Sequence, residues 1–190
     1  RSQASLSTFV DPTGPELTRP APLRGGVAVF AAQAACPFQS FARHRLTATT
    51  VAEPRPGIDV RHKGQIIHAT LATLWLGLKN SRALDALDRD ERHCLIRDAI
   101  AENFAPMPFE TRLEREIRFV ERERLTVLLD TWLDFELSRS PFEVIAAEQS
   151  ATVVFNDLEI QIRVDRIDCL DDGQEIIIDY KTGACRAADW

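Results

Sequence analysis

The apolar periodicity of this chain changes once, close to residue 140, and this change limits the folds that it can adopt. Before it, apolar residues recur at the three- and four-residue spacing of amphipathic helices. After it, they alternate, as they do along half-buried β-strands. Helices followed by strands are typical of an α+β fold. We therefore predict a central mixed sheet of three to four strands in a meander, flanked by helices, several of which precede the sheet.

The helical part of the sequence predicts three main helices, over residues 64–78, 83–104 and 110–138. A shorter helix with basic residues follows Pro37. The apolar face of the third main helix is expected to comprise Leu113, Ile117, Val120, Leu128, Trp132 and Phe135. Its charged residues between 114 and 124 are interpreted as a solvated, ion-paired surface, because acidic residues interleave every arginine. A functional basic stripe is the alternative.

Four strands are predicted, over residues 142–148, 151–155, 158–168 and 175–181. Asn156-Asp157 suits a tight hairpin turn, and Asp171-Asp172-Gly173 suits the next one. The continuous run Ile176-Ile177-Ile178 is what a strand buried on both faces requires.

The length, composition and ends of the chain indicate how it divides into domains. The 190 residues suffice for one domain with a real core. Residues 1–28, rich in proline and with Gly25-Gly26, predict a linker or arm, which leaves 29–190 as the domain. Because the chain begins at Arg1 and ends at Trp190, just after a dense motif, we expect a piece of a longer polypeptide, truncated at its C-terminus.

Charge and cysteine content exclude some classes of protein. The net charge of −6 provides no global attraction to nucleic acid, so DNA binding would need local groups of basic residues. No apolar run approaches the ~20 residues that cross a bilayer, so we expect no membrane association. Cys36, Cys94, Cys169 and Cys185 form no C-x-x-C pair, which argues against a zinc site or a disulfide framework and favours a reducing cytoplasm.

Two carboxylates and an ammonium are expected to meet on the sheet. Asp165 and Asp179 lie on consecutive strands joined by a short turn, and Asp179 and Lys181 are two residues apart, on one face. A hard divalent cation such as Mg²⁺ prefers such oxygen ligands and would activate water for phosphodiester hydrolysis. The alternative is a set of cross-strand ion pairs that includes Arg166 and Asp168, and the spacing alone leaves both open.

Several segments, taken together and in order, resemble the RecB-type nuclease domains of the PD-(D/E)XK superfamily. The likeness is nearest to the C-terminal nuclease domains of AddB-like helicase–nuclease subunits and runs from about residue 30 to 185. It implies a restriction-endonuclease-like core. The segments that carry it are Cys36-Pro37-Phe38-x-x-Phe41, Gly64-x-x-x-His68-x-x-Leu71, Glu148, Val164-Asp165-Arg166-Ile167-Asp168 and Asp179-Tyr180-Lys181-Thr182-Gly183.

The resemblance implies roles for these residues. His68, Asp165 and Asp179 would hold Mg²⁺ or Mn²⁺ with the main-chain carbonyl of Tyr180, and Lys181 would be the catalytic lysine. From its position alone, His68 on an apolar helix face is more readily a core histidine; only the resemblance makes it a ligand. Glu148 is expected to support the site. The residues expected to contact DNA are Arg43, Arg45, Arg61, Lys63 and Arg166.

The chain departs from the family's pattern in three places, one of which is Arg163, where many relatives have glycine. The family continues into a helix with a Gln-x-x-x-Tyr motif, and this chain stops at Trp190, which leaves open whether the fragment is active alone. Some members bind an iron–sulfur cluster through a cysteine near the Cys-Pro-Phe position and three later ones. No such trio follows here, so a cluster is not expected, and Cys36 is predicted to be a small buried hydrophobe.

Three functions follow from these observations. The first is a metal-dependent deoxyribonuclease of the exonuclease type, acting on DNA ends or single strands in DNA repair or recombination, with a helicase domain or subunit as partner and a cytoplasmic location. The second is a catalytically inactive nuclease-fold module that holds DNA ends or serves as a scaffold. The third is a metal-dependent phosphatase for small phosphoesters.

Overall fold

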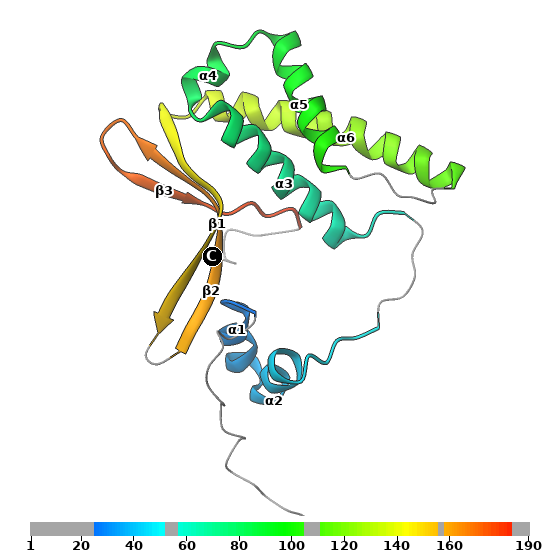
Figure 1. Ribbon diagram of the computed structural model, residues 1–190, viewed down its shortest axis with the longest axis vertical. Coiled ribbons are helices and arrows are strands. Elements are labelled where there is room, and N and C mark those ends of the chain that lie inside the picture. Colours follow the sequence, from blue (N-terminus) through cyan, green and yellow to red (C-terminus); the bar gives the residue numbers. More distant parts are fainter. Residues whose placement is uncertain (1–24, 52–56, 105–110, 156–157, 184–190) are drawn as a thin grey trace, which may run out of the picture.

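The computed structural model describes residues 25–51, 57–104, 111–155 and 158–183, which form helices followed by a sheet (Figure 1). The predicted α+β class and restriction-endonuclease-like core are therefore confirmed. Most of the predicted linker, residues 1–24, lies outside the described residues. Within them the helices are α1 (Ala28–Ala35), α2 (Pro37–Ser40), the π-helix η1 (Phe41–Arg45), α3 (Val60–Leu78), α4 (Ser81–Asp85), α5 (Arg89–Asn103) and α6 (Arg112–Leu137).

The sheet is a meander in the order β1 (Phe142–Phe155), β2 (Leu158–Leu170) and β3 (Glu175–Ile178). Both strand pairs are antiparallel, so the expected mixed character is wrong for the described residues. The physical reason is that strands joined by short turns can pair only in antiparallel fashion. The segments 142–148 and 151–155, predicted as two strands, form the single strand β1.

Helix α3 is the central element of the core. The Asp59 carboxylate caps it by accepting hydrogen bonds from the backbone N–H groups of Arg61 (2.6 Å) and His62 (3.4 Å). Its stripe of Ile67, Leu71 and Trp75 is buried and packs against α5 and β1. At its other end, the N–H of Val144 donates to the carbonyl of Lys79 at 2.7 Å, which joins the helical layer to the sheet.

Figure 1 shows α3, α5 and α6 together at one end of the sheet, whereas α1 and α2 lie apart from them, beside the hairpin end of β1 and β2. Edge-to-face packing of Phe30 on Phe155, with ring centroids 5.6 Å apart, links α1 to that hairpin. Among the described helices, none is both long enough and apolar enough to cross a membrane.

The helix predicted over 83–104 is two helices, α4 and α5. The break arises from a capping box, in which the Asp88 carboxylate accepts from the Glu91 N–H at 2.8 Å and Glu91 accepts from the Asp88 N–H at 3.0 Å. The Asn80 side chain caps α4 separately. Local side-chain hydrogen bonds therefore divide a segment whose apolar periodicity is continuous.

The apolar face predicted for α6 is wrong. Leu113 and Phe135 are 63% and 54% exposed, and the buried stripe runs instead through Leu125, Leu129 and Leu133. The same stripe begins at Glu121 and ends at Glu136, two buried acids that pair with Lys63 of α3 and Arg166 of β2, respectively. Periodicity assigned Glu121 to the solvated face because it cannot detect such a partner.

Strand β3 is less buried than its sequence suggested. Ile177 is 69% exposed, whereas Ile176 and Ile178 are half-buried. Exposure alternates along the strand, so only one of its faces packs on the protein. The prediction that the isoleucine run is buried on both faces is therefore wrong.

Candidate metal centre

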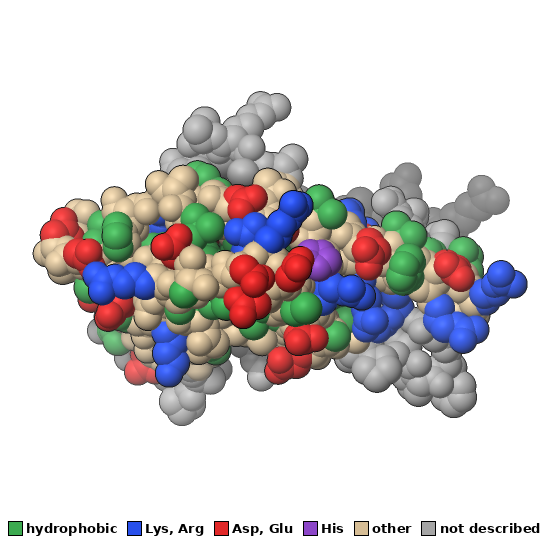
Figure 2. Space-filling model, turned by 90° about the horizontal axis from the view of Figure 1, so that it is seen from above, with side chains coloured by type: hydrophobic (Ala, Val, Ile, Leu, Met, Phe, Trp, Pro, Cys, Tyr) green, Lys and Arg blue, Asp and Glu red, His purple; other side chains and the backbone are tan. Residues whose placement is uncertain are grey.

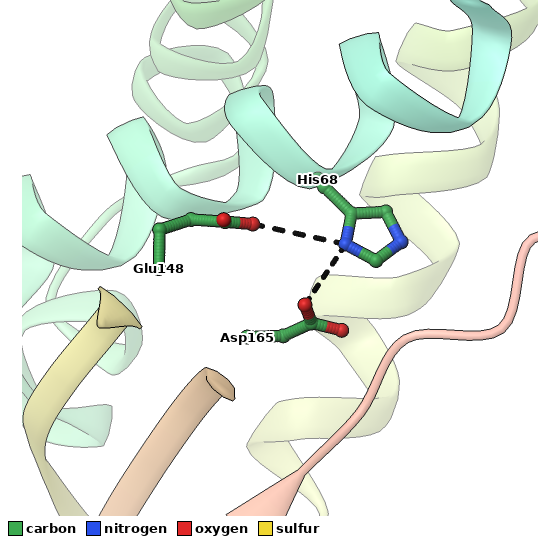
Figure 3. Close-up of side chains that lie close together, drawn as sticks. All are labelled: His68, Glu148 and Asp165. Atoms are coloured by element: carbon green, nitrogen blue, oxygen red, sulfur yellow. Dashed lines mark ion pairs between the residues drawn. The ribbon is translucent and has the colours of Figure 1, made fainter. Parts of the chain in front are cut away.

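A histidine and two carboxylates converge where α3 crosses the middle of β1 and β2. The Nδ1 atom of His68 lies 3.1 Å from Asp165 Oδ1 and 3.7 Å from Glu148 Oε1, and Figure 3 shows both acids pointing to this nitrogen. The ligand atoms of all three half-buried residues lie within 4.8 Å of one another. Distances of this size allow one ion to contact all three.

The strand register explains why the two acids meet. Ala147 pairs with Arg166 and Gln149 with Val164, which places Glu148 opposite Asp165. Strand β1 is irregular here, with a register shift between Val144 and Ala146. Glu148 itself has a φ of +52°, a left-handed conformation that costs roughly 1–2 kcal/mol in a residue other than glycine. Strain of this kind is concentrated at functional sites.

The carboxylate oxygens of Glu148 can accept more hydrogen bonds than the described residues donate to them. Both carboxylate oxygens are buried, and neither has a hydrogen-bond partner among the described residues. They form ion pairs with His68 and with the exposed Arg163. Beyond these ion pairs, both oxygens keep lone pairs that accept no hydrogen bond from the described residues, and a bound cation would use them. The donor set of one imidazole nitrogen and carboxylate oxygens therefore fits a divalent metal ion.

Tyr180 holds this group in place. Its backbone N–H donates to Asp165 Oδ2 at 2.7 Å, which leaves Oδ1 directed at His68. Its ring packs edge-on against His68 and Trp132, with centroids 6.0 and 5.9 Å away. Burial raises the pKa of the Tyr180 hydroxyl above its ordinary value, although Arg166 lowers it. The resemblance implied a role only for the carbonyl of this residue, and no sequence pattern pointed to its side chain or its N–H.

Asp179 and Lys181 lie beside the group but outside it. Strand β3 ends at Ile178, and the two residues follow in an exposed segment, where their side chains form an ion pair. The structure therefore brings His68 and Asp165 together as expected, but with Glu148 as the third member of the group instead of Asp179. The sequence carried one signal for Glu148, its inclusion among the matching segments, and only the register brings it opposite Asp165.

Arg166 is not a DNA contact, which corrects the prediction made for it. It is 1% exposed, and its guanidinium donates to both oxygens of Glu136 and of Asp168, at 2.6–2.9 Å. It also donates to the Tyr180 hydroxyl at 3.0 Å and stacks over Trp75, 4.1 Å from the ring centroid. The reason is its inward-facing position on β2, next to Asp168 on the same face of the strand and against Glu136 of α6. Burial lowers the pKa of Arg166, but these hydrogen bonds outweigh it, and the net shift is upward.

The other predicted DNA contacts differ in their surroundings. Arg43 and Arg45 are exposed on η1, and Arg61 is exposed in the first turn of α3. Lys63 pairs with Glu121 at 3.0 Å. Glu121 also accepts from Arg124, and although burial raises its pKa, the bonds to Arg124 and Lys63 lower it overall. Acidic and basic side chains intermingle on the face that Figure 2 shows, so DNA binding there would depend on local groups.

Cys36 is exposed, which contradicts the prediction of a buried hydrophobe. It lies at the break between α1 and α2, in an extended conformation with φ −164°. Pro37 causes the break, because a proline disfavours helical geometry in the residue before it. Cys36, Cys94 and Cys169 are free, and Cys185 lies outside the described residues.

Comparison with known proteins identifies one family. The family model of the PD-(D/E)XK nuclease superfamily matches residues 28–189. That range contains α1 to β3 and the group of His68, Glu148 and Asp165. No curated protein matches the chain.

Proposed function

Since the chain belongs to the PD-(D/E)XK nuclease superfamily, we propose that it is a metal-dependent deoxyribonuclease of the exonuclease type, active in DNA repair or recombination. Membership makes it a nuclease domain of a superfamily that acts with divalent metals. The observation that carries the proposal is the convergence of His68, Glu148 and Asp165 within 4.8 Å, inside the matched region. DNA ends or single strands are the proposed substrates, with a helicase domain or subunit as partner and the cytoplasm as location.

The proposed metal ligands are His68, Glu148 and Asp165, with Asp179 and the Tyr180 carbonyl as further candidates. Carboxylate oxygens suit Mg²⁺ and Mn²⁺, and the imidazole nitrogen favours Mn²⁺ of the two. When bound, such an ion lowers the pKa of a coordinated water and offsets negative charge on a phosphate oxygen.

The chain's own residues would position the reacting groups. The Tyr180 N–H orients the Asp165 carboxylate, and the buried Arg166 holds the Tyr180 ring through its hydroxyl. The Asp179 carboxylate keeps the Lys181 ammonium at the edge of the site through their ion pair. The ammonium would lie next to a phosphate bound at this edge. Its positive charge would stabilise the negative charge that develops on the phosphate during hydrolysis.

Glu148→Gln is expected to lower Mn²⁺ affinity by about 10- to 100-fold, because it removes the charge of a carboxylate whose oxygens accept no hydrogen bond from the described residues. Asp179→Asn should have a smaller effect, since Asp179 lies outside the group of three. Isothermal titration calorimetry with Mn²⁺ measures both. The reverse order of effects would assign the ligand role to Asp179 and leave Glu148 a supporting residue.

Lys181→Met is expected to lower the cleavage rate of Mn²⁺-loaded protein by about 100-fold or more, with Mn²⁺ affinity nearly unchanged. Lys63→Met is the matched comparison: Lys63 pairs with Glu121, and its loss should raise KM more than it lowers kcat. End-labelled linear DNA and closed single-stranded circles are the substrates, and an exonuclease leaves the circles intact.

Other outcomes of this assay select the alternatives. A parent protein that binds linear DNA in Mg²⁺ and Mn²⁺ but cuts none of it is a non-enzymatic module. A protein that cleaves an aryl phosphate but no DNA is a small-ester phosphatase. Cleavage of the circles at the rate of linear DNA would contradict the exonuclease assignment alone.

A further inference from the structure

A cavity of about 420 Å³ lies between α3, α6 and the segment that follows β3. This volume is within the range of pockets that hold small organic ligands. The lining residues on which the argument depends are Lys63, Ile67, Arg124, Leu128, Trp132 and Lys181. The metal-binding group makes no use of most of these residues.

The cavity has an apolar interior and a charged rim. Ile67, Leu71, Leu128 and the indole of Trp132 contribute apolar surface. Lys63, Arg124 and Lys181 bring basic groups to the rim, where Glu121 and Asp179 pair with them. A flat indole and aliphatic side chains below a rim with basic groups match a nucleotide, whose base is flat and largely apolar on its faces and whose phosphate is anionic.

The cavity adjoins the metal-binding group through Tyr180. This residue lines the cavity, and its N–H donates to Asp165. Gly64 allows α3 to approach the same segment closely: a Cβ there would lie 3.0 Å from Thr182 Oγ1. A strand whose phosphate lies at Lys181 therefore has a base within reach of the cavity.

We propose that this cavity binds one unpaired nucleobase of the DNA strand being cut, with Trp132 and Leu128 as the contact residues. The inference rests on the proposed function, and it adds that the substrate nucleotide is unpaired. A base can enter only after leaving its stack and its partner, which costs least in a single strand or at a frayed end. Base-paired internal nucleotides are therefore poor substrates.

The test is oligonucleotide binding in EDTA, which prevents cutting. The probe is a fluorescently labelled 12-nucleotide single strand, compared by anisotropy with versions carrying one abasic site at successive positions. For the parent protein, one position should lose affinity by about tenfold when its base is removed, from the usual contribution of base stacking on an aromatic side chain. The other positions should change little.

Two variants connect that position to the cavity. Trp132→Ala should bind the intact strand as weakly as the parent binds the critical abasic strand. Leu128→Trp, at a 43%-exposed position, should fill the cavity with little risk to folding and have the same effect. Phe119→Ala is the matched control, since this exposed aromatic of α6 lines a different cavity and should preserve the position dependence.

Three results overturn the proposal: no position sensitive to base removal, a sensitive position that persists unchanged in both Trp132→Ala and Leu128→Trp, or a parent protein that binds no oligonucleotide. The proposed function is tested separately, by cleavage in Mn²⁺. If the parent protein shows the expected position dependence but does not cleave DNA, the base-binding proposal stands and the nuclease proposal is wrong. If it cleaves DNA but shows no position dependence, the nuclease proposal stands and the base-binding proposal is wrong.

Discussion

Asp165→Asn is expected to reduce Mn²⁺ affinity by about 100-fold and to abolish detectable DNA cleavage. Asp165 contacts both His68, at 3.1 Å, and the Tyr180 N–H, at 2.7 Å, so it links the imidazole to the segment that carries Lys181. Asparagine has nearly the same shape and can still accept from the Tyr180 N–H. The substitution therefore removes the charge with little effect on the fold. Mn²⁺ titration and cleavage of end-labelled DNA measure the two losses.

The control for this substitution is Asp171→Asn, which removes an exposed carboxylate at the β2–β3 turn. It should leave both quantities unchanged, and circular dichroism melts should show that both variants fold. Cleavage by Asp165→Asn at the rate of the parent protein would show that the His68–Glu148–Asp165 group is only an ion-pair cluster.

Arg166→Met is expected to destabilise the domain by about 3–5 kcal/mol. Glu136 and Asp168 are both 0% exposed, and the substitution removes the guanidinium that neutralises them. Arg139 still pairs with each of these acids, but it cannot replace the two bidentate contacts. Chemical denaturation, followed by tryptophan fluorescence, measures the change in the free energy of unfolding.

Arg163→Met is the matched control, because Arg163 lies on the same strand with its side chain 61% exposed. Its loss should cost clearly less than that of Arg166, because solvent screens a guanidinium that is mostly exposed. If Arg166→Met costs no more than this control, the buried cluster does not depend on Arg166. Replacing Arg166, Glu136 and Asp168 together by apolar residues should recover much of the loss, because no buried charge then lacks a partner.

Local patterns predicted much of the secondary structure. The change from helical to strand periodicity near residue 140 matches the step from α6 to β1, and the stripe through Ile67 and Leu71 matches the buried face of α3. Such patterns are local, since a helix or strand repeats its contacts every few residues. The break at Asp88 was also encoded locally, as a capping box, but continuous periodicity concealed it.

The candidate site was predictable in part. The order of motifs pointed to His68, Asp165 and Asp179, and the structure assembles the first two with Glu148. Glu148 lies in the group where Asp179 was predicted, for two reasons that depend on the tertiary structure. Strand β3 ends before Asp179, and the irregular β1 turns Glu148 towards Asp165 through a left-handed backbone conformation. Neither a strand's end nor its bulge follows from the spacing of acids along the chain.

The sequence by itself determined the α+β order, the sheet meander and the superfamily, because these depend on periodicity and on a motif order that can be read along one chain. Only the tertiary structure decided which charged residues are buried. Arg166, Glu136 and Glu121 look like solvated residues in the sequence, yet each is buried against partners 30 or 58 residues away. The reason is physical: the free energy of burying a charge depends on the partner that meets it in space, and sequence neighbours do not specify that partner.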